Sequence, residues 1–294
     1  IMQKLEQLMR ETYTPDLLIV PGDVNSTLAG ALVANKMNIR LAHLESGLRS
    51  HDKTMPEEHN RKVADHLADL HFVTEDAGLI NLDEEGIRNN GICFTGNTMI
   101  DTLIAFQDQI GDSNILDEHK LQENGFALVT IHRPSNVDSE ESLGTVAEVL
   151  ESTSAKIPVV FPVHPRTMQR MQEFGMLKRF ENIERLKMIE PQSYFDFQRL
   201  IASSCFVLTD SGGIQEETTY LQKPCLTLRP NTERPVTIDM GSNMLLPFDI
   251  DIIEKRVNDI LNGQFKKGEI PRFWDGKATE RVLERISSYF ELGS

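Results

Sequence analysis

The chain has 294 residues, of which 39% are hydrophobic and 26% charged, as expected for a soluble globular protein with room for two domains. Its net charge of −15 argues against a nucleic-acid partner, because binding a phosphate backbone needs a surplus of Lys and Arg. An anionic small molecule remains compatible with this charge, since a few Arg residues and helix N-termini can hold one locally.

The cysteines and the hydropathy indicate a cellular compartment. Cys93, Cys205 and Cys225 lie in apolar contexts without paired spacing, so we expect thiols buried in a reducing compartment. The sequence contains no apolar run long enough to span a membrane and no signal peptide. We therefore expect a cytoplasmic protein without a membrane partner. Residue 1 is Ile rather than Met, a first indication of a fragment.

Short apolar runs alternate with longer amphipathic stretches along the chain. The expected strands are residues 17–20, 39–44, 70–73, 126–131, 159–163, 186–189, 205–208 and 225–228, with a short run at 92–94. The expected helices are residues 26–36, 57–68, 142–153, 195–203, 213–221 and 277–292. Strands that are apolar throughout indicate a parallel sheet covered on both faces, and hence an α/β fold.

A polar stretch between Phe106 and Gln122 interrupts this rhythm and predicts a domain boundary. We expect an N-terminal catalytic Rossmann-like domain at residues 1–108, to which the C-terminal helix 277–294 crosses back. A second Rossmann-like domain at 109–276 is expected to bind the nucleotide. Two doubly wound domains that face a cleft can hold a nucleotide at the carboxyl ends of their strands.

Polar residues follow four of the predicted strands. Asp23, Glu45, His132 and Ser211 each come soon after an apolar run ends. Because the carboxyl ends of parallel strands meet at one edge of a sheet, this recurrence predicts a functional site.

The candidate site residues of the predicted N-terminal domain are mostly carboxylates. Asp23 has a structural alternative as a helix N-cap, whereas Glu45 is unusual at a strand end beside a glycine turn. Glu57 and Glu58 follow a proline at a predicted helix start, and we interpret Glu58 as a favourable helix-dipole residue. Arg61 lies four residues after Glu57, so a salt bridge between them is expected.

His132 and Arg133 end a predicted strand, where a polar pair is more often functional than structural. His164 is similarly placed, with a structural role equally compatible. Arg61, Arg133 and His164 are therefore expected to support the site. The other histidines are expected to be surface, cap or core residues: His43, His51, His59, His66, His71 and His119.

The segment from Thr209 to Glu217 begins at a strand end and opens a helix. Gly212 and Gly213 let the backbone approach an anion, and the helix N-terminus favours phosphate. Ser211 adds a hydroxyl donor, and Glu217 lies one turn into the helix. The alternative is a capped strand-to-helix turn, which the following Gln-Glu-Glu and the loop with Arg234 disfavour.

Several carboxylates and one histidine suit the removal of a proton from carbon. No spacing in the sequence is typical of a metal site, a serine-hydrolase elbow, a Walker loop or a dinucleotide fingerprint. We therefore expect no metal and no cofactor.

Together these segments resemble the non-hydrolysing UDP-N-acetylglucosamine 2-epimerase family. The motifs that carry the resemblance are PGDVNSTLAG, HLESGLRS, MPEEHNR, FTGNTMIDTL, VTIHRPSN, TDSGGIQEE and TERP, in the family's order from about Leu17 onward. The resemblance implies two domains like those of GT-B glycosyltransferases, a UDP-sugar substrate and a homodimer.

The resemblance also assigns site residues. The UDP and substrate contacts implied are Gln192 and Phe197 for uridine, Ser211, Gly212 and Gly213 for the diphosphate, Glu217 for the ribose, and Arg234. The residues implied in catalysis are Asp23, Glu45, Glu57 and His132. The family removes the C2 proton and expels UDP to give a 2-acetamidoglucal, then adds UDP back with a proton on the other face.

The sequence departs from the family in two places. Pro134-Ser135-Asn136 replaces the family's Arg-Glu-Asn or Ala-Glu-Asn, which leaves the exact sugar open. The family's opening strands and a Gly-Thr-Arg-Pro-Glu loop are absent, so we expect an incomplete first domain. A chain of these 294 residues alone is then expected to bind UDP but to epimerise poorly and to aggregate.

Three alternatives follow from the same residues. A hydrolysing 2-epimerase would release UDP and free N-acetylmannosamine. A UDP-sugar-binding module would bind without turnover. A GT-B glycosyltransferase is less compatible with this set of acidic motifs.

Overall fold

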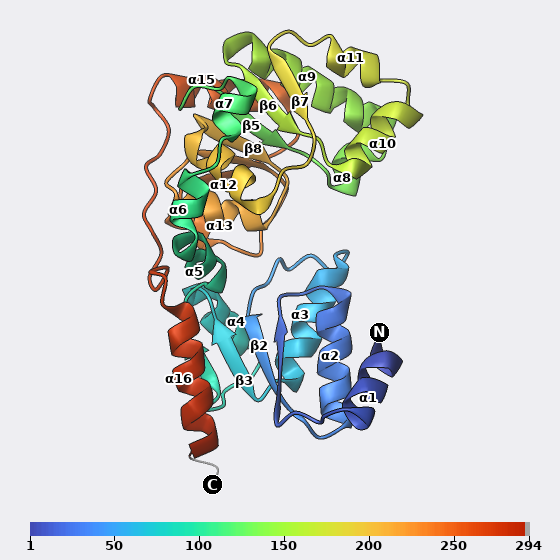
Figure 1. Cartoon of the computed structure of the whole chain (residues 1–294), viewed down its shortest axis with the longest axis vertical. Helices are drawn as coiled ribbons and strands as arrows, with labels where there is room; N and C mark the ends of the chain where they lie inside the picture. Colours follow the sequence, from blue (N-terminus) through green and yellow to red (C-terminus); the bar gives the residue numbers. More distant parts are fainter. Residues whose placement is uncertain (292–294) are drawn as a thin grey trace. The chain divides into compact units, whose positions relative to one another are not determined.

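The computed structural model describes residues 1–291 and divides into two compact units (Figure 1). Unit 1 comprises Ile1–Thr102, Glu233–Val236 and the chain from Pro271 onward, and unit 2 comprises Leu103–Thr232 and Thr237–Ile270. The polar stretch predicted as a boundary folds as two short helices, α6 (Gln107–Gly111) and α7 (Ile115–His119), which lie in unit 2.

Unit 1 is built on a four-stranded parallel sheet whose strands lie in chain order. The strands are β1 (Leu17–Pro21), β2 (Arg40–Ser46), β3 (Leu70–Val73) and β4 (Ile92–Phe94). The helices of this unit are α1 (Met2–Glu11), α2 (Asn25–Lys36), α3 (Pro56–Leu67), α4 (Asp76–Glu84), α16 (Ala278–Glu291) and the first part of α5 (Thr98–Ala105).

Two apolar clusters cover the two faces of this sheet. On one face, Met9 of α1, Val33 of α2 and Ala64 of α3 pack against Leu41 of β2. On the other, Val282 of α16 packs against a group that includes Ala42, Leu70 and Phe72. Figure 1 shows α1, α2 and α3 on one side of the sheet and α16 on the other. Burial on both faces explains why most residues of these strands are apolar.

Unit 2 contains a six-stranded parallel sheet in the order β10-β9-β8-β5-β6-β7. Its strands are β5 (Ala127–Thr130), β6 (Val159–Pro162), β7 (Leu186–Ile189), β8 (Phe206–Thr209), β9 (Cys225–Leu228) and β10 (Asn243–Leu246). The chain winds outward from β5 in one direction and then from β8 in the other. This is the doubly wound order, and it places the switch point between β5 and β8.

The helices of unit 2 begin with local signals that the sequence carries. They are α8 (Pro134–Val137), α9 (Glu140–Lys156), α10 (Pro165–Glu173), α11 (Leu177–Glu181), α12 (Tyr194–Ser203), α13 (Gly213–Tyr220), α14 (Val236–Asp239, of which Val236 is counted in unit 1) and α15 (Ile250–Leu261). Ser139, Ser193 and Asp249 cap α9, α12 and α15 with their side-chain oxygens.

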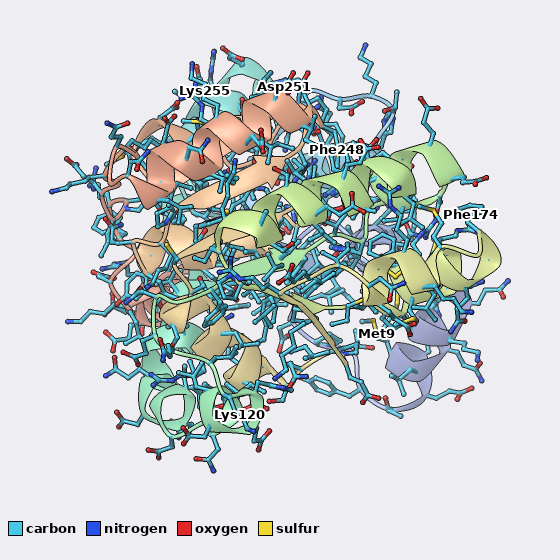
Figure 2. All side chains as sticks on the ribbon, turned by 90° about the horizontal axis from the view of Figure 1, so that it is seen from above. Met9, Lys120, Phe174, Phe248, Asp251 and Lys255 are labelled. Carbon is cyan, nitrogen blue, oxygen red and sulfur yellow. The ribbon has the colours of Figure 1, made fainter. Side chains whose placement is uncertain are left out.

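The pair α9 and α15 illustrates how unit 2 is packed. Ile253 and Val257 of α15 belong to the same buried cluster as Val146 and Leu150 of α9. Asp251 and Lys255 project from the opposite face of α15 (Figure 2). The spacing of the apolar residues thus sets which face of the helix meets its neighbours.

The fold-class prediction is confirmed: the chain is an α/β protein with parallel sheets covered by helices, as in the GT-B-like fold. All the predicted strands and helices are present within residues 1–291, and Leu292, the end of the last predicted helix, lies outside the described residues. The strand β10 was not predicted. It begins with Asn243, a polar residue whose buried side chain bonds to Gln215 and Thr227, so the apolar pattern there is too short to indicate a strand.

The three cysteines are free thiols, of which Cys225 is buried and Cys93 and Cys205 are half-buried. Burial raises the pKa of each thiol. Within residues 1–291, every helix is too short or too polar to cross a membrane.

Candidate functional site

In unit 1, the carboxylate of Asp23 lies just after β1 and is held by Arg61 of α3. Nη1 of Arg61 pairs with Oδ2 of Asp23, and Nδ2 of Asn60 donates to the Asp23 carbonyl at 2.8 Å. The Asp23 side chain is 26% exposed, whereas that of Arg61 is 2% exposed. Because α2 begins after Val24 without a side-chain cap, Asp23 is not a helix cap. A buried guanidinium therefore fixes a carboxylate that still reaches solvent.

Glu45 lies near the end of β2 with a φ of +65°, in the left-handed region. A non-glycine residue held there costs about 1–3 kcal/mol, so the surrounding structure must impose the conformation. Its Oε2 lies 3.2 Å from Nη2 of Arg234, which belongs to the segment Glu233–Val236 of unit 1. A Cβ added at Gly22 would lie 3.7 Å from Oε1 of Glu45, so the turns that carry Asp23 and Glu45 are neighbours.

The predicted salt bridge between Glu57 and Arg61 is wrong. Arg61 pairs instead with Asp23 and with Glu58, whose Oε2 lies 3.0 Å from Nη2. Glu58 is 1% exposed and also accepts hydrogen bonds from N and Oγ of Ser50, at 2.8 and 3.0 Å. Burial alone would raise its pKa, but the bonds from Ser50 and Arg61 outweigh burial and lower it. Glu58 does lie in the first turn of α3, as predicted, but it is also a buried ion, and Glu57 is half-buried beside it.

In unit 2, the candidate residues lie at the switch point of the sheet. The strands β5 and β8 are paired neighbours, and the hydroxyls of Thr130 and Thr209 lie 2.8 Å apart at their carboxyl ends. His132 follows the first strand and Ser211 the second. A doubly wound sheet binds its ligand outside the strand ends at this point, where the two crossover directions diverge.

Asp210 orients His132. Its Oδ1 lies 3.0 Å from Nδ1 of the His132 ring, and the carboxylate also accepts the backbone N–H groups of His132 and Arg133. Nδ2 of Asn136 donates to the same carboxylate at 3.0 Å. Asp210 is fully buried, which would raise its pKa, but His132 and its other donors outweigh burial and lower it. With Nδ1 bound to an ionised carboxylate, Nε2 of His132 is the nitrogen left for a ligand.

Arg133 and His164 flank this pair. Nε of Arg133 donates to the carbonyl of Asp210 at 2.9 Å, which ties β5 to β8. The ring of His164 lies 5.0 Å from that of His132, and its Nδ1 accepts the Arg166 N–H at the start of α10. Burial, followed by the nearby His132, lowers the pKa of His164. His164 is thus a helix cap that also packs against His132.

The loop Ser211-Gly212-Gly213 leads from β8 into α13. The helix begins after Gly212 without a side-chain cap, and all three residues are half-buried. An uncapped helix N-terminus directs backbone N–H groups and the positive end of the dipole toward an anion. The loop is therefore suited to bind phosphate.

Glu217 lies one turn into α13 and is 6% exposed. Burial raises its pKa to about 7, although a hydrogen bond from the buried side chain of Gln198 on α12 acts in the opposite direction. Phe197 directly precedes Gln198 in α12, and Gln192 lies two residues before the helix begins. Gln192 is half-buried, and Phe197 packs against the cluster that contains Leu200 and Val207.

The segment in which the sequence departs from the family pattern also contributes to this edge of unit 2. Asn136 is one of the four donors to Asp210 described above. Ser135 and Asn136 line a hollow of about 500 Å³ together with Arg229 and Phe248. Within residues 1–291, no cluster of His, Cys, Asp or Glu side chains is arranged to hold a metal ion.

Four buried residues next to the predicted site were not among the predicted site residues: His43, Glu58, Asp65 and Asp210. Asp210 follows β8 directly within the Thr-Asp-Ser-Gly-Gly motif, so its position at a strand end was a usable signal. His43 and Asp65 lie inside a strand and a helix, where no sequence signal distinguishes a buried hydrogen-bonded pair from isolated polar residues.

The chain is similar to several known proteins. A family model described as UDP-N-acetylglucosamine 2-epimerase matches residues 1–287. A Methanocaldococcus jannaschii protein named UDP-N-acetylglucosamine 2-epimerase is 39% identical over 282 residues, covering 94% of this chain and 76% of the relative. A Pseudomonas aeruginosa relative, named UDP-2,3-diacetamido-2,3-dideoxy-D-glucuronate 2-epimerase, is 34% identical and covers 93% of this chain and 75% of its own.

A solved structure is also similar to the chain. The crystal structure of the M. jannaschii UDP-GlcNAc 2-epimerase in complex with UDP-GlcNAc and UDP has a TM-score of 0.89 at 37% identity. The match covers 98% of this chain and 79% of that chain.

Proposed function

Because the chain belongs to the UDP-N-acetylglucosamine 2-epimerase family, we propose that it interconverts UDP-N-acetylglucosamine and UDP-N-acetylmannosamine. The family model and the relatives confirm the family resemblance seen in the sequence. The observation in the structure that best supports the proposal is the Asp210-bound His132 beside the Ser211-Gly212-Gly213 loop, at the switch point of unit 2. This arrangement places a proton-transfer group next to a phosphate-binding helix terminus.

In the proposed reaction, a base removes the proton from C2 as the C1–O bond to UDP breaks. The electron pair of the C–H bond forms the C1–C2 double bond of a 2-acetamidoglucal, and UDP leaves with the bonding pair of the C1–O bond. UDP then adds back to C1 while a proton is delivered to the opposite face of C2. The chemistry needs donors for the departing diphosphate and acid–base groups for two faces of one carbon.

In unit 2, we assign Ser211, Gly212 and Gly213 to the diphosphate, Glu217 to the ribose hydroxyls, and Gln192 and Phe197 to the uridine. The uncapped start of α13 supports the first assignment, and the buried carboxyl of Glu217 supports the second. His132 is assigned to proton transfer, with Arg133 and His164 as its supports.

In unit 1, we assign Asp23, Glu45 and Glu57 to the proton transfers and Arg234 to the substrate. The exposure of Asp23 and Glu45 supports this, because both carboxylates reach solvent while their basic partners are nearly buried. Arg61 holds Asp23, so we assign it a supporting role.

The test is to incubate the full-length protein with UDP-N-acetylglucosamine and follow the products by proton NMR. Formation of UDP-N-acetylmannosamine to a constant ratio supports the proposal. Release of UDP with free N-acetylmannosamine would identify a hydrolysing enzyme, and binding without turnover a UDP-sugar-binding module. A parallel reaction with a UDP-2,3-diacetamido sugar examines the choice of sugar, since one relative is named for such a substrate.

We also propose that the protein works as a cytoplasmic homodimer. Three free thiols support a reducing compartment, and the family resemblance supports the dimer. Light scattering of the purified protein gives its mass directly, and a monomer at micromolar concentration would contradict the dimer.

A further inference from the structure

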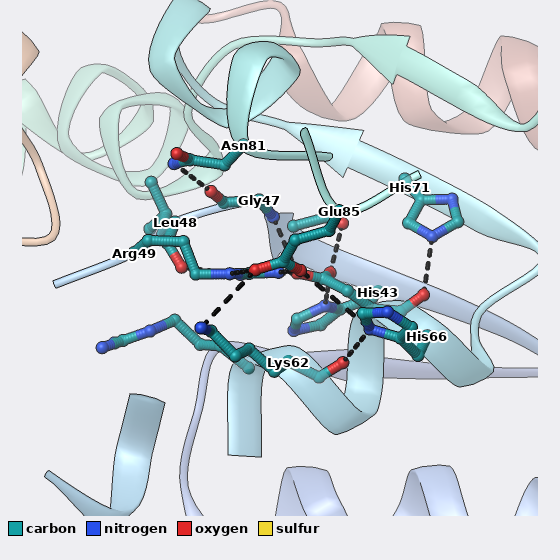
Figure 3. Close-up of polar contacts among 12 residues, drawn as sticks. His43, Gly47, Leu48, Arg49, Lys62, His66, His71, Asn81 and Glu85 are labelled. Carbon is teal, nitrogen blue, oxygen red and sulfur yellow. Dashed lines mark hydrogen bonds and ion pairs between the residues drawn. The ribbon is translucent and has the colours of Figure 1, made fainter. Parts of the chain in front are cut away.

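His43 lies in the middle of β2, fully buried, within a network of polar side chains in unit 1 (Figure 3). Both of its ring nitrogens have a partner. Nδ1 lies 2.6 Å from Oδ1 of Asp65, and Nε2 lies 2.8 Å from the backbone carbonyl of Gly22. The two partners come from different elements, α3 and the turn after β1.

Both partners of His43 are hydrogen-bond acceptors. The Gly22 carbonyl has no proton to give. The Asp65 carboxylate accepts the hydroxyl of Ser46 and the N–H of Gly47, and it lies 2.7 Å from Nη1 of Arg49, so it is an ion. A neutral imidazole has one N–H and would leave one nitrogen lone pair facing an acceptor, whereas an imidazolium donates from both nitrogens.

We propose that His43 carries a proton on both ring nitrogens and is a positioning residue that fixes the two turns bearing Asp23 and Glu45. The inference rests on the proposed catalytic roles of those two carboxylates. His43 touches neither of the reacting carboxylates through a hydrogen bond, and it acts through the backbone that carries them.

The first turn is clamped at Gly22. Its N–H donates to the Leu44 carbonyl at 3.1 Å, and its own carbonyl accepts the Nε2–H of His43. Gly22 has a φ of +61°, which glycine adopts without the strain that a side chain would add. With both polar groups of Gly22 bound to β2, the backbone leading into Asp23 has little freedom.

The second turn is held by the same ion pair. Asp65 binds the side chain of Ser46 and the N–H of Gly47, the two residues that follow Glu45. The left-handed backbone of Glu45 therefore has a defined cause in its neighbours. One buried imidazolium–carboxylate pair thus joins both turns to α3.

The charges around His43 agree with this protonation. The groups that face it are Asp65 of α3, Glu45 of β2 and His71 of β3, while Arg49 faces the other side of Asp65 and pairs with Glu85. Burial alone would lower the pKa of His43, but the hydrogen bond and charge of Asp65, the Gly22 carbonyl and Glu45 outweigh it and raise the pKa.

His71 provides a matched comparison. It is also fully buried, but among residues 1–291 only its Nε2 has a hydrogen-bond partner, the backbone carbonyl of Asp65 at 2.8 Å, while Nδ1 has none. The carbonyl can only accept, so the proton lies on Nε2, and burial lowers the pKa of His71, which favours the neutral ring. The paired strands β2 and β3 thus hold one charged and one neutral histidine side by side.

The direct test uses the unmutated full-length protein, labelled with 15N in its histidines. Two-dimensional NMR across about pH 6 to pH 8, the range in which a free imidazole titrates, reports the proton on each ring nitrogen. We expect both nitrogens of His43 to stay protonated and His71 to show the neutral Nε2–H form. A His43 ring with one unprotonated nitrogen at pH 7 overturns the proposal.

A kinetic test separates positioning from folding. His43→Gln keeps a donor for Gly22 but loses the cation beside Asp65, and we expect kcat to fall by about 100-fold, the cost of small misplacements of reacting groups. The Kd for UDP should change by less than about twofold, because the assigned uridine and diphosphate contacts lie in unit 2. The control, His71→Gln, keeps the single donor of His71 and should retain kcat within about twofold.

The possible outcomes distinguish a failure of the positioning role of His43 from a failure of the proposed function. Equal loss of kcat in the His43 and His71 variants, or no loss in either, would count against positioning by His43. If the unmutated protein turned over no UDP-sugar, the proposed function would fail while the NMR result still decided the state of His43.

Discussion

Oδ1 of Asp210 lies 3.0 Å from Nδ1 of His132, although the two residues are 78 positions apart in the sequence. The pair joins the ends of β8 and β5 at the switch point of unit 2, where the loop to α13 also begins. A buried carboxylate that binds one nitrogen of an imidazole fixes its tautomer and leaves the other nitrogen to exchange protons.

We expect Asp210→Asn to lower kcat by at least about 100-fold, because an amide in place of an orienting carboxylate favours the wrong tautomer of His132. Steady-state kinetics with the UDP-sugar measure the loss. Asp249→Asn is the matched control, since Asn can also cap the start of α15. Equal kcat values for Asp210→Asn and the parent protein would remove Asp210 from the account.

Ser211→Ala should weaken UDP binding by about 1–3 kcal/mol, the contribution of a hydrogen bond to a charged group. Isothermal titration with UDP measures the change. Ser152→Ala, which removes a hydroxyl that donates to Glu254 on the same unit, is the control and should bind UDP like the parent. Unchanged affinity in Ser211→Ala would refute the assignment of this loop to the diphosphate.

Asp23→Asn and Glu45→Gln should each reduce kcat by orders of magnitude, since an amide cannot accept a proton from carbon. UDP affinity should stay nearly constant, because the assigned UDP contacts lie in unit 2. The exposed Glu84 of the same unit supplies the control substitution Glu84→Gln. If UDP affinity fell as far as kcat, the two carboxylates would be binding residues instead.

Glu217→Gln tests the buried carboxyl through its effect on stability. Burial raises the Glu217 pKa from 4.5 to about 7, so the folded state keeps its proton where the unfolded state has lost it. The resulting cost to stability is absent below the unfolded pKa, grows as pH rises from about 4.5 to 7, and is constant above that.

Without ligand, the Gln variant should therefore be more stable than the parent at pH 8, by about 1–3 kcal/mol, and nearly equal to it at about pH 4.5. Urea unfolding at several pH values measures this difference. The same variant should bind UDP more weakly, because it loses an acceptor for the ribose hydroxyls. A difference in stability that does not depend on pH would show that Glu217 is not the group responsible.

The elements of both units were predictable because most of their strands are buried on both faces and therefore largely apolar, as in Val159–Pro162. Asp23, Glu45, His132 and Ser211 were predictable as candidates because each comes soon after an apolar run. Their place after a strand is a local property that the sequence displays directly.

The partners that hold these candidates were not predictable in the same way. Asp65 meets His43 from 22 residues away, and a hydrogen-bonding pair at that distance leaves no periodic pattern. Glu58 differs from Glu57 only by facing inward from α3, which depends on how the helix packs. Helix spacing gave Arg61 the wrong carboxylate, because Arg61 pairs with Glu58, three residues earlier on the buried face of α3, and with Asp23 after β1.

The central claim is that the protein breaks and remakes the C2–H bond of its UDP-sugar. The most direct measurement is to run the reaction of the full-length enzyme in D2O and to examine C2 of the product by NMR and mass spectrometry. The account predicts that the epimerised product carries deuterium at C2, because the returning proton comes from a group that exchanges with solvent. An epimerised product that retains only its original C2 hydrogen would contradict it.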